Sequence, residues 1–394
     1  MKCGFDSRWT YMKYDFDSVI NRRNTGSVKW DVRDNELPMW VADMDFRTAP
    51  EIMQAIQKRM DNGVFGYSTI PDEWALSYVH WWEKRHSLKT DPSWFSFCTG
   101  VIPIISCAIR EFTETGDNVL IQSPVYNAFF NIIRNNGRRV LESELTYRDG
   151  AYSMDFADLE TKLSDPKTKM FVLCNPHNPV GRIWSRDELD KVGELCHKHG
   201  VLVISDEIHC DITDPDILYT PFASVSECCR ENSITAMAPT KCFNIAGIQS
   251  AATMTPNPDL RKRMAEALYL NLANEANAFA VDATIAAFEH GEQWLDQMRS
   301  YMFENKQVVL DYVRKNIPKL YVVPSRATYL LWLDCSAFTS DSLAFAAEIR
   351  RKTGLFLSYG TQYGEAGRQF LRFNIACPRT LLLDGLNRLR TALS

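Results

Sequence analysis

Three short apolar runs in the middle of the chain each end directly in a group of polar residues. Residues 170–174 are followed by NPHNPVGR, residues 201–205 by DEIH and residues 234–238 by PTKCFNIAG. Helical patterns lie between these runs, and such an alternation is typical of βαβ units in a parallel sheet. Ligands bind beyond the carboxyl ends of parallel strands. The sequence therefore predicts an α/β fold in which three strand ends bring an amide, a carboxylate and an amine to one crevice.

The limits of two further elements can be predicted. Residues 119–122 are a candidate strand. Ser185 and Glu188 have the spacing of a capping box, which predicts that a helix begins there. Gly200 is expected to end this helix.

The length of the chain predicts two domains. Single cores stop growing at roughly 250–300 residues, and this chain has 394. Residues 49–285 carry the βαβ pattern and are expected to form a large domain. Residues 1–48 and 286–394 lack it and are expected to combine into a smaller domain, with a cleft between the two.

The distribution of charge argues against several classes of partner. The formal net charge is -5, with acidic and basic residues interspersed, so no basic stripe could follow a nucleic acid. No run approaches about 18 apolar residues, and charges interrupt the N-terminal stretch where a signal peptide needs an apolar core. We expect a small-molecule substrate and a cytoplasmic location, without nucleic-acid or membrane partners.

The 11 cysteines show no pattern of a metal or redox site. They include no C-x-x-C pair and no Cys/His cluster at metal-ligand spacing. We therefore expect reduced, buried thiols and no metal. For the adjacent Cys228 and Cys229, which lie in a polar stretch, we expect a loop.

The three strand-end groups, in this order, resemble the fold-type I pyridoxal-phosphate enzymes of the aspartate aminotransferase superfamily, over nearly the whole chain. The MalY/PatB-type carbon-sulfur β-lyases, which include cystathionine β-lyases and cystalysin, are the more specific resemblance. It is carried by VADMDF at 41–46, FGYS at 65–68, SPVYNAFF at 123–130, NPHNPVGR at 175–182, SDEIH at 205–209, APTKCFNIAGIQ at 238–249 and FLRFNIACP at 370–378. This resemblance implies a fold-type I transferase fold, with helices on both faces of a mostly parallel central sheet and a smaller α+β domain. It also implies pyridoxal 5'-phosphate (PLP) as the cofactor.

Lys241 and Asp206 match the two family residues that act directly on this cofactor. Lys241 matches the Schiff-base lysine, a role that needs a neutral amine and hence a pKa well below the usual value of about 10.4. Asp206 matches the carboxylate that keeps the pyridine nitrogen protonated, so that the ring is an electron sink. A solvated loop lysine and a helix-capping aspartate are the alternatives.

Three more side chains match family positions around the cofactor ring. Asn178 matches the donor to the phenolate oxygen, and His209 stands where many aminotransferases have a tyrosine aimed at the same oxygen. Tyr126 matches the aromatic residue that stacks on the ring, and we expect its hydroxyl to assist the amine exchange or the departing sulfur. If a Tyr126→Phe variant had unchanged turnover, Tyr126 would not have that catalytic role. The alternatives are a turn asparagine, a core histidine and a core tyrosine.

The phosphate of the cofactor is expected at a helix N-terminus, where free N–H groups and the helix dipole favour an anion. The run TGVIP provides one, with main-chain donors from Gly100, Val101 and Ile102. Thr240 is expected to add a hydroxyl from beside the lysine.

Two other positions bear on the phosphate. Related aminotransferases usually have an arginine eight residues after the lysine, and here that residue is Gln249. This departure matches the β-lyase branch. Tyr67 resembles the tyrosine that reaches the phosphate of the neighbouring subunit, which implies a homodimer with shared active sites.

The substrate is expected to bind beside the strand FLRFNIA. Its apolar residues alternate with Arg372 and Asn374, so these two side chains share the face toward the cleft. Arg372 matches the family arginine that binds the α-carboxylate, for which a planar guanidinium is suited. A surface ion pair is the alternative. The backbone near Val41 and Ala42 is expected to close the same pocket.

The resemblance implies a β-lyase that removes the Cα proton of a sulfur amino acid and expels sulfur from Cβ. The products would be a thiol, pyruvate and ammonia. An aminotransferase shares the early steps and is one alternative. A cofactor-binding regulator that docks on a partner protein is the other, and intact catalytic groups argue against regulation as its only role.

Overall fold

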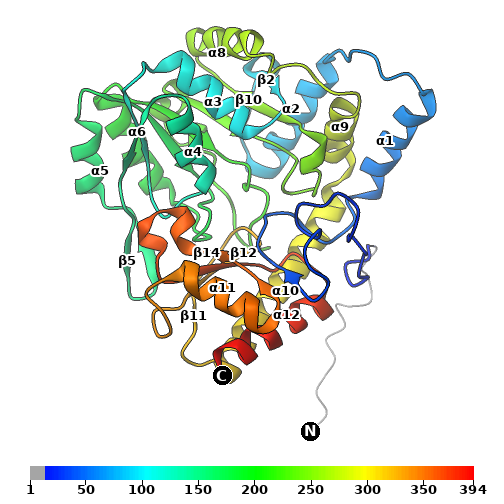
Figure 1. The fold of residues 1–394 in the computed structure, drawn as a ribbon. Coiled ribbons are helices and arrows are strands. Elements are labelled where there is room, and N and C mark those ends of the chain that lie inside the picture. Colours follow the sequence, from blue (N-terminus) through cyan, green and yellow to red (C-terminus); the bar gives the residue numbers. More distant parts are fainter. Residues whose placement is uncertain (1–13) are drawn as a thin grey trace.

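The computed structural model describes residues 14–394 and contains two main β-sheets with helices around them (Figure 1). The larger sheet has seven strands in the order β2, β10, β9, β8, β7, β3 and β4. The strands from β9 to β4 are parallel to one another, and β10 is antiparallel to both of its neighbours. The strands span Phe95–Cys98 (β2), Asn118–Ile121 (β3), Arg139–Glu142 (β4), Thr168–Cys174 (β7), Leu202–Asp206 (β8), Ser233–Met237 (β9) and Ala251–Met254 (β10).

Helices cover both faces of this sheet, because successive side chains of each strand point to opposite faces. Val172 of β7 joins an apolar cluster with α3, α4 and α8 on one face. Phe171 and Leu173 join a second cluster with α5 and α6 on the other face. These helices span Val101–Phe112 (α3), Asn127–Asn135 (α4), Phe156–Leu163 (α5), Arg186–Lys198 (α6) and Pro258–Leu270 (α8). The mostly parallel sheet between two helix layers confirms the predicted α/β fold class.

The predicted elements lie within one or two residues of the observed ones. Helix α6 begins after Ser185, whose side chain accepts from the backbone N–H of Glu188 while the Glu188 side chain accepts from Ser185 N–H, which is a complete capping box. The helix ends at Lys198, and Gly200 follows with a φ of 65°. The loop expected at Cys228 and Cys229 is wrong, because both residues lie in the short helix α7 (Glu227–Glu231).

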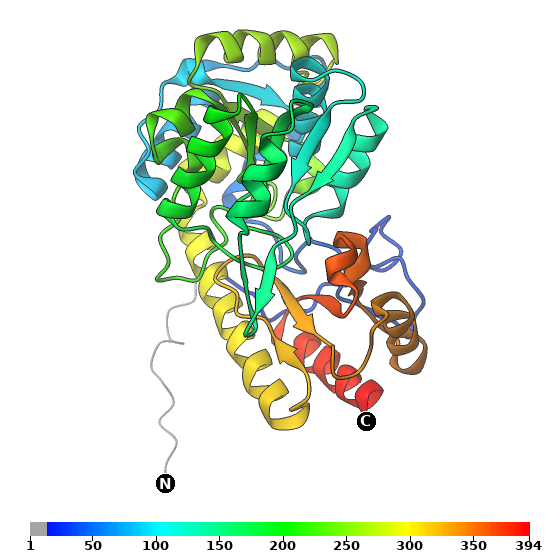
Figure 2. The same ribbon diagram turned by 90° about the vertical axis from the view of Figure 1, so that its left-hand side faces the viewer.

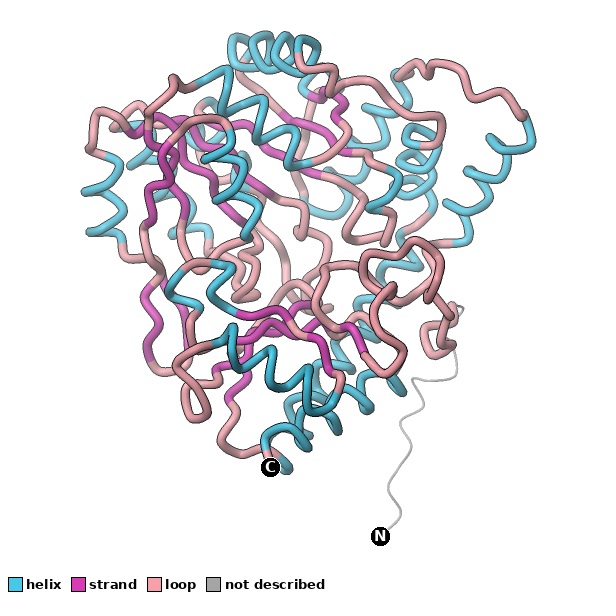
Figure 3. Tube along the Cα trace, viewed as in Figure 1, coloured by secondary structure: helices cyan, strands magenta, loops and turns pink. Residues whose placement is uncertain are grey.

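The smaller sheet has four antiparallel strands in the order β11, β12, β15 and β14. Figure 3 shows it as a separate group of strands below the larger sheet. Strand β1, from the N-terminal part of the chain, pairs in parallel with β13 beside this sheet. The strands span Leu37–Pro38 (β1), Tyr321–Val322 (β11), Leu330–Asp334 (β12), Leu355–Phe356 (β13), Ser358–Tyr359 (β14) and Phe370–Asn374 (β15).

The long helix α10 runs from the region of the larger sheet down along the smaller one, as Figure 2 shows. It spans Glu292–Asn316, and α11 (Ser342–Thr353) and α12 (Arg379–Leu393) lie beside the smaller sheet. The boundaries 48/49 and 285/286 of the two expected domains stay a prediction, and residues 1–13 of the smaller one lie outside the described residues.

The remaining elements complete the part around the larger sheet. Helix α9 (Ala280–His290) packs against α1 (Pro50–Asn62) and α2 (Asp72–His86). A short hairpin joins β5 (Thr146–Arg148) to β6 (Ala151–Ser153). Within residues 14–394, no helix combines the length and the apolar character that crossing a bilayer requires.

Candidate active site

A cavity of about 210 Å³ lies at the carboxyl ends of the parallel strands. Asp206 ends β8, Asn178 follows β7, and Lys241 follows β9. The complete lining is Ala42, Gly100, Val101, Ile102, Pro103, Tyr126, Cys174, Asn178, Asp206, Ile208, His209 and Lys241. The structure thus brings together the amide, the carboxylate and the amine that the sequence places at three strand ends.

The amine of Lys241 is held at one wall of this cavity. Its Nζ donates to the carbonyl oxygen of Ala42 at 2.7 Å. Burial lowers its pKa to about 8; the charge of Arg372 acts in the same direction, while Asp43 and Asp206 oppose it. The neutral form, which a nucleophile or base requires, is therefore far more populated near neutral pH than in an exposed lysine.

The carboxylate of Asp206 is buried and forms no direct ion pair within the described part of the chain. The residue is 4% exposed, and its Oδ1 accepts from the backbone N–H of Ile208 at 3.1 Å. Burial raises its pKa to about 7, and Lys241 opposes this only in part. A buried carboxylate of this kind is stabilised by a cation placed against it. The site fits a protonated pyridine nitrogen.

Arg372 is a buried cation with unused hydrogen-bonding capacity. It is 5% exposed, and its Nη1 donates to Asn178 Oδ1 at 3.1 Å and its Nη2 to the Trp40 carbonyl at 2.9 Å. Its Nε has no partner, and within residues 14–394 no carboxylate pairs with it. The guanidinium stacks over the ring of Tyr363 at 4.8 Å. A planar cation fixed in this way is suited to an anionic ligand such as a carboxylate.

His209 and Tyr126 keep their neutral forms in this environment. Burial, together with the charges of Lys241 and Arg372, lowers the pKa of His209 to about 3. Its Nδ1 is buried and has no hydrogen-bond partner among the described residues. Burial also raises the pKa of Tyr126, which Arg372 opposes. The tyrosine is therefore a hydroxyl donor, and the imidazole has a free nitrogen for a ligand.

The N-terminus of α3 forms the anion-binding side of the cavity. Gly100 is its N-cap residue, no side chain caps it, and its first turn holds no acidic residue. The first N–H groups of a helix lack partners within the helix, and together with the dipole they favour an anion. This end of the cavity fits the phosphate of PLP, as the sequence predicts for Gly100, Val101 and Ile102.

Two predicted phosphate ligands lie outside the cavity lining. Thr240 is buried directly before Lys241. Tyr67 is fully exposed, at 101%, and lies with Gln249 in a separate surface hollow. Within this chain Tyr67 does not reach the cavity, so any contact with a cofactor would have to come from a second copy.

Sequence reasoning missed several residues at the site. Cys174, Pro103 and Ile208 line the cavity although only their strand-end or helix-start positions indicate it. Tyr329 contacts the same Ala42 carbonyl as Lys241, at 3.2 Å, and no motif points to it. Asn374 binds the neighbouring carbonyls of Val41 and Asp43, which agrees with its predicted place on the face of Arg372.

A buried polar cluster of His86, Cys210 and Asp211 lies behind the loop that carries His209. Their potential ligand atoms are all within 4.8 Å of one another. Asp211 is already hydrogen-bonded to His86 Nε2 at 3.1 Å and to Trp81 Nε1 at 3.0 Å. These bonds account for the cluster as an anchor of the loop after β8 to helix α2.

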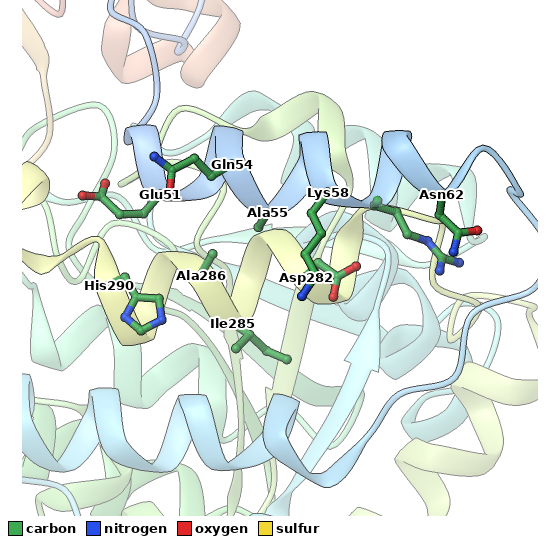
Figure 4. A pocket seen from close by; sticks show the side chains of 10 residues that line it. Glu51, Gln54, Ala55, Lys58, Asn62, Asp282, Ile285, Ala286 and His290 are labelled. Carbon is green, nitrogen blue, oxygen red and sulfur yellow. The ribbon is translucent and has the colours of Figure 1, made fainter.

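A larger cavity of about 510 Å³ lies between α1 and α9, away from the strand ends (Figure 4). Figure 4 shows Lys58 of α1 reaching toward α9, which carries Asp282. Its lining mixes acidic, basic and apolar side chains of the two helices and contains neither Lys241 nor Asp206. The strand-end cavity is therefore the candidate active site.

Comparison with known proteins agrees with this geometry. The family model for aminotransferase class I and II matches residues 37–389. The chain is 42% identical over 386 residues to cystathionine beta-lyase PatB of Bacillus subtilis (strain 168), covering 96% of this chain and 100% of PatB. It is 34% identical over 388 residues to protein MalY of Escherichia coli (strain K12), covering 96% and 99% of the two chains. The crystal structure of cystalysin from Treponema denticola, which contains a pyridoxal 5'-phosphate cofactor, matches with a TM-score of 0.94 and 35% identity over 97% of this chain and 99% of that one.

Proposed function

The chain belongs to the class I and II aminotransferase family, and from this membership we propose that it is a PLP-dependent carbon-sulfur β-lyase. It cleaves cystathionine, cysteine or a related S-substituted cysteine to a thiol, pyruvate and ammonia. The observation that carries the proposal is that one cavity holds both Lys241, whose pKa is lowered, and Asp206, which forms no direct ion pair among the described residues. The names of the relatives PatB and cystalysin, and Gln249 in place of the usual arginine, favour a lyase over a transaminase.

The residues of the cavity divide into those that hold the cofactor and those that hold the substrate. The N-terminus of α3 would hold the phosphate, with the hydroxyl of Thr240, outside the cavity lining, as a further ligand. Asp206 would hold the pyridine nitrogen, Tyr126 would lie against the ring, and Asn178 and His209 would bind its phenolic oxygen. When bound, PLP supplies an electron sink for the charge that develops at Cα.

The side chains of this chain perform the remaining steps. Arg372 orients the substrate through its α-carboxylate, and Ala42 closes the pocket beside it. The neutral amine of Lys241 then takes the proton from Cα, because burial lowers its pKa to about 8. The Cβ–S bond breaks, and the Tyr126 hydroxyl donates its proton to the departing sulfur. The released aminoacrylate reacts with water to give pyruvate and ammonia.

We expect sustained release of pyruvate when the PLP-loaded protein is incubated with cystathionine and no keto acid. A lyase regenerates its starting form in every cycle, whereas a transaminase without a keto acid stops after one half-reaction. Pyruvate is measured by coupled reduction, and the thiol with a chromogenic disulfide. Equal amounts of thiol and pyruvate over many turnovers support the lyase. A single stoichiometric conversion of the cofactor to its amine form would instead establish the transaminase.

We also propose that the protein is a homodimer in which Tyr67 of one copy completes the active site of the other. Two groups of large apolar side chains are exposed, as is typical of an interface between subunits. Val64 and Phe65 lie just before Tyr67 in the chain, and Tyr269, Leu270 and Leu272 lie at and just after the end of α8. The Tyr67 ring lies in the same surface hollow as Gln249, which follows the lysine-bearing segment. A second copy seated here would bring its tyrosine close to the phosphate end of the cavity.

A mixing experiment tests this arrangement. Tyr67→Ala and Lys241→Ala are each expected to be nearly inactive alone. When the two variants are unfolded and refolded together, half of the dimers should be mixed, and each mixed dimer should hold one intact site. The mixture should therefore regain about a quarter of the active sites. Light scattering checks the dimer, and each variant refolded alone is the control. Failure of the mixture to regain activity would show that Tyr67 acts within its own chain or not at all.

We place the protein in the cytoplasm. The ten cysteines within residues 14–394 are free thiols, and nine of them are buried, which suits a reducing compartment. Cell fractionation tests this location.

A further inference from the structure

Side chains from distant parts of the chain bind the backbone carbonyl groups of residues 41–43. Asn374 Nδ2 donates to the carbonyls of Val41 at 2.6 Å and Asp43 at 2.7 Å. The carbonyl of Ala42, between them, instead accepts from Lys241 Nζ at 2.7 Å and from the Tyr329 hydroxyl at 3.2 Å. Two side chains from the smaller sheet region thus control the segment that meets the reactive amine.

Tyr329 is rigidly placed for this contact. It directly precedes β12, whose first residue, Leu330, pairs with Asn374 of β15. The carbonyl of Tyr329 also accepts from Ile375 N–H at 2.9 Å, so its backbone is tied to β15. Its side chain is 1% exposed, and its ring packs edge-on against His209, with centroids 6.2 Å apart. The hydroxyl therefore has no access to bulk water and depends on the Ala42 carbonyl as its acceptor.

We propose that Tyr329 is a positioning residue for Lys241: its hydroxyl fixes the Ala42 carbonyl, which is the acceptor that holds the free amine in place for proton transfer. This inference rests on the proposed function, in which Lys241 is the reactive amine. Tyr329 itself does not line the cavity, so it acts through the carbonyl and not by touching the substrate.

The arrangement has a consequence for the amine's protonation. A carbonyl that already accepts from a hydroxyl is a weaker acceptor for an ammonium group. Without that hydroxyl, the carbonyl favours the charged amine more strongly, so the pKa of Lys241 should rise. Asp43, Asp206 and Arg372 are the charged groups that act on this amine, and His209, which is neutral, faces it as well. Removing only the Tyr329 hydroxyl changes none of these side chains and keeps the ring that packs against His209.

Tyr329→Phe tests the proposal, since it removes the hydroxyl and keeps the ring. The full-length protein is freed of cofactor and mixed with PLP at a series of pH values. The rate of covalent attachment is followed by visible absorbance, and the product is reduced with borohydride and located by mass spectrometry. This rate reports the fraction of neutral Lys241 and needs no substrate turnover. We expect the midpoint of the pH profile to move upward by about 0.5–1 pH unit, the size of shift that one neutral hydrogen bond produces.

Tyr152→Phe is the matched control. Tyr152 is also a buried tyrosine whose hydroxyl contacts β12, where it accepts from Trp332 Nε1 at 3.1 Å, but no contact joins it to residues 41–43. Its pH profile should coincide with that of the wild type. If Tyr329→Phe is insoluble, Tyr329→Met removes the same hydroxyl with a side chain that adapts to the space.

The outcomes separate this inference from the proposed function. A midpoint for Tyr329→Phe that equals the wild-type midpoint, or lies below it, overturns the positioning role. An equal upward shift in Tyr152→Phe overturns it too, because the effect would then be general. Absence of covalent attachment in the wild type would instead reject the proposed function.

Discussion

Replacing Lys241 by alanine should abolish β-elimination and the covalent attachment of PLP. The expected loss in kcat is at least about 10⁴-fold, the upper range for one acid-base group, because the same amine also holds the cofactor. Alanine leaves the Ala42 carbonyl with its second donor, Tyr329, so the local backbone should keep its place. Turnover is measured as pyruvate release, and covalent attachment as mass added after borohydride reduction.

Lys241→Arg is the control for loss of charge. It keeps a cation near Asp206 and Asp43 but offers no amine that can become neutral. We expect it to be as inactive as the alanine variant. Turnover in either variant above about one per cent of wild type would contradict the assignment of the base, given the range expected for such groups.

Replacing Asp206 by asparagine should lower the activity of the enzyme and raise the stability of the cofactor-free protein. Activity should fall by about 10²–10³-fold, the cost of removing one preorganised charge from an active site, because the pyridine nitrogen loses its anionic partner. The cofactor-free protein should at the same time become more stable at pH 8. Asparagine can retain the bond from Ile208 N–H while removing a carboxylate that burial makes costly.

The pH dependence of this second effect has a definite sign. The pKa of Asp206 is about 7 in the folded protein against an ordinary value of 3.8, so the folded state binds its proton more tightly than the unfolded state does. Folding stability is therefore lost as the pH rises through this window, and the loss is complete above about 7. The stabilisation by Asp206→Asn should be full at pH 8 and vanish toward pH 4. Thermal unfolding of the cofactor-free proteins measures it.

Glu207→Gln is the matched control for Asp206→Asn. Glu207 is the next residue, is equally buried, and burial raises its pKa to about 7 as well. Its Oε1 accepts from Ser205 and from Phe222 N–H, and the residue does not line the cavity. We expect a similar pH-dependent stabilisation without loss of activity. Equal losses of activity in both variants would show that Asp206 has no special relation to the cofactor.

The sequence predicts the central part of the fold and the residues around the cavity well, because these predictions depend only on residues that are neighbours in the sequence. A buried parallel strand requires a continuous apolar run, and the first polar residue after it must lie at the strand end. Asp206 and Lys241 could therefore be placed from a few neighbouring residues each. The roles of these residues, by contrast, stay proposals, because position alone does not establish chemistry.

Contacts between distant segments were beyond sequence reasoning. Nothing near Tyr329 indicates that its hydroxyl meets the carbonyl of a residue 287 positions earlier. His86 and Asp211 likewise meet only because α2 packs behind the loop after β8. The five-residue helix at Cys228 and Cys229 is too short for a helical period to show, so the polar composition suggested a loop instead.

The pairing of β1 with β13, and of Asn374 with residues 41–43, has a consequence for biosynthesis. While the chain is still on the ribosome, its first strand must wait for more than three hundred residues before its partner emerges. Until then the amine at 241 lacks the Ala42 carbonyl, the Arg372 guanidinium and part of the burial that lowers its pKa. The lysine of the nascent chain should therefore have a higher pKa, and its reactivity toward aldehydes should increase when the last strand docks.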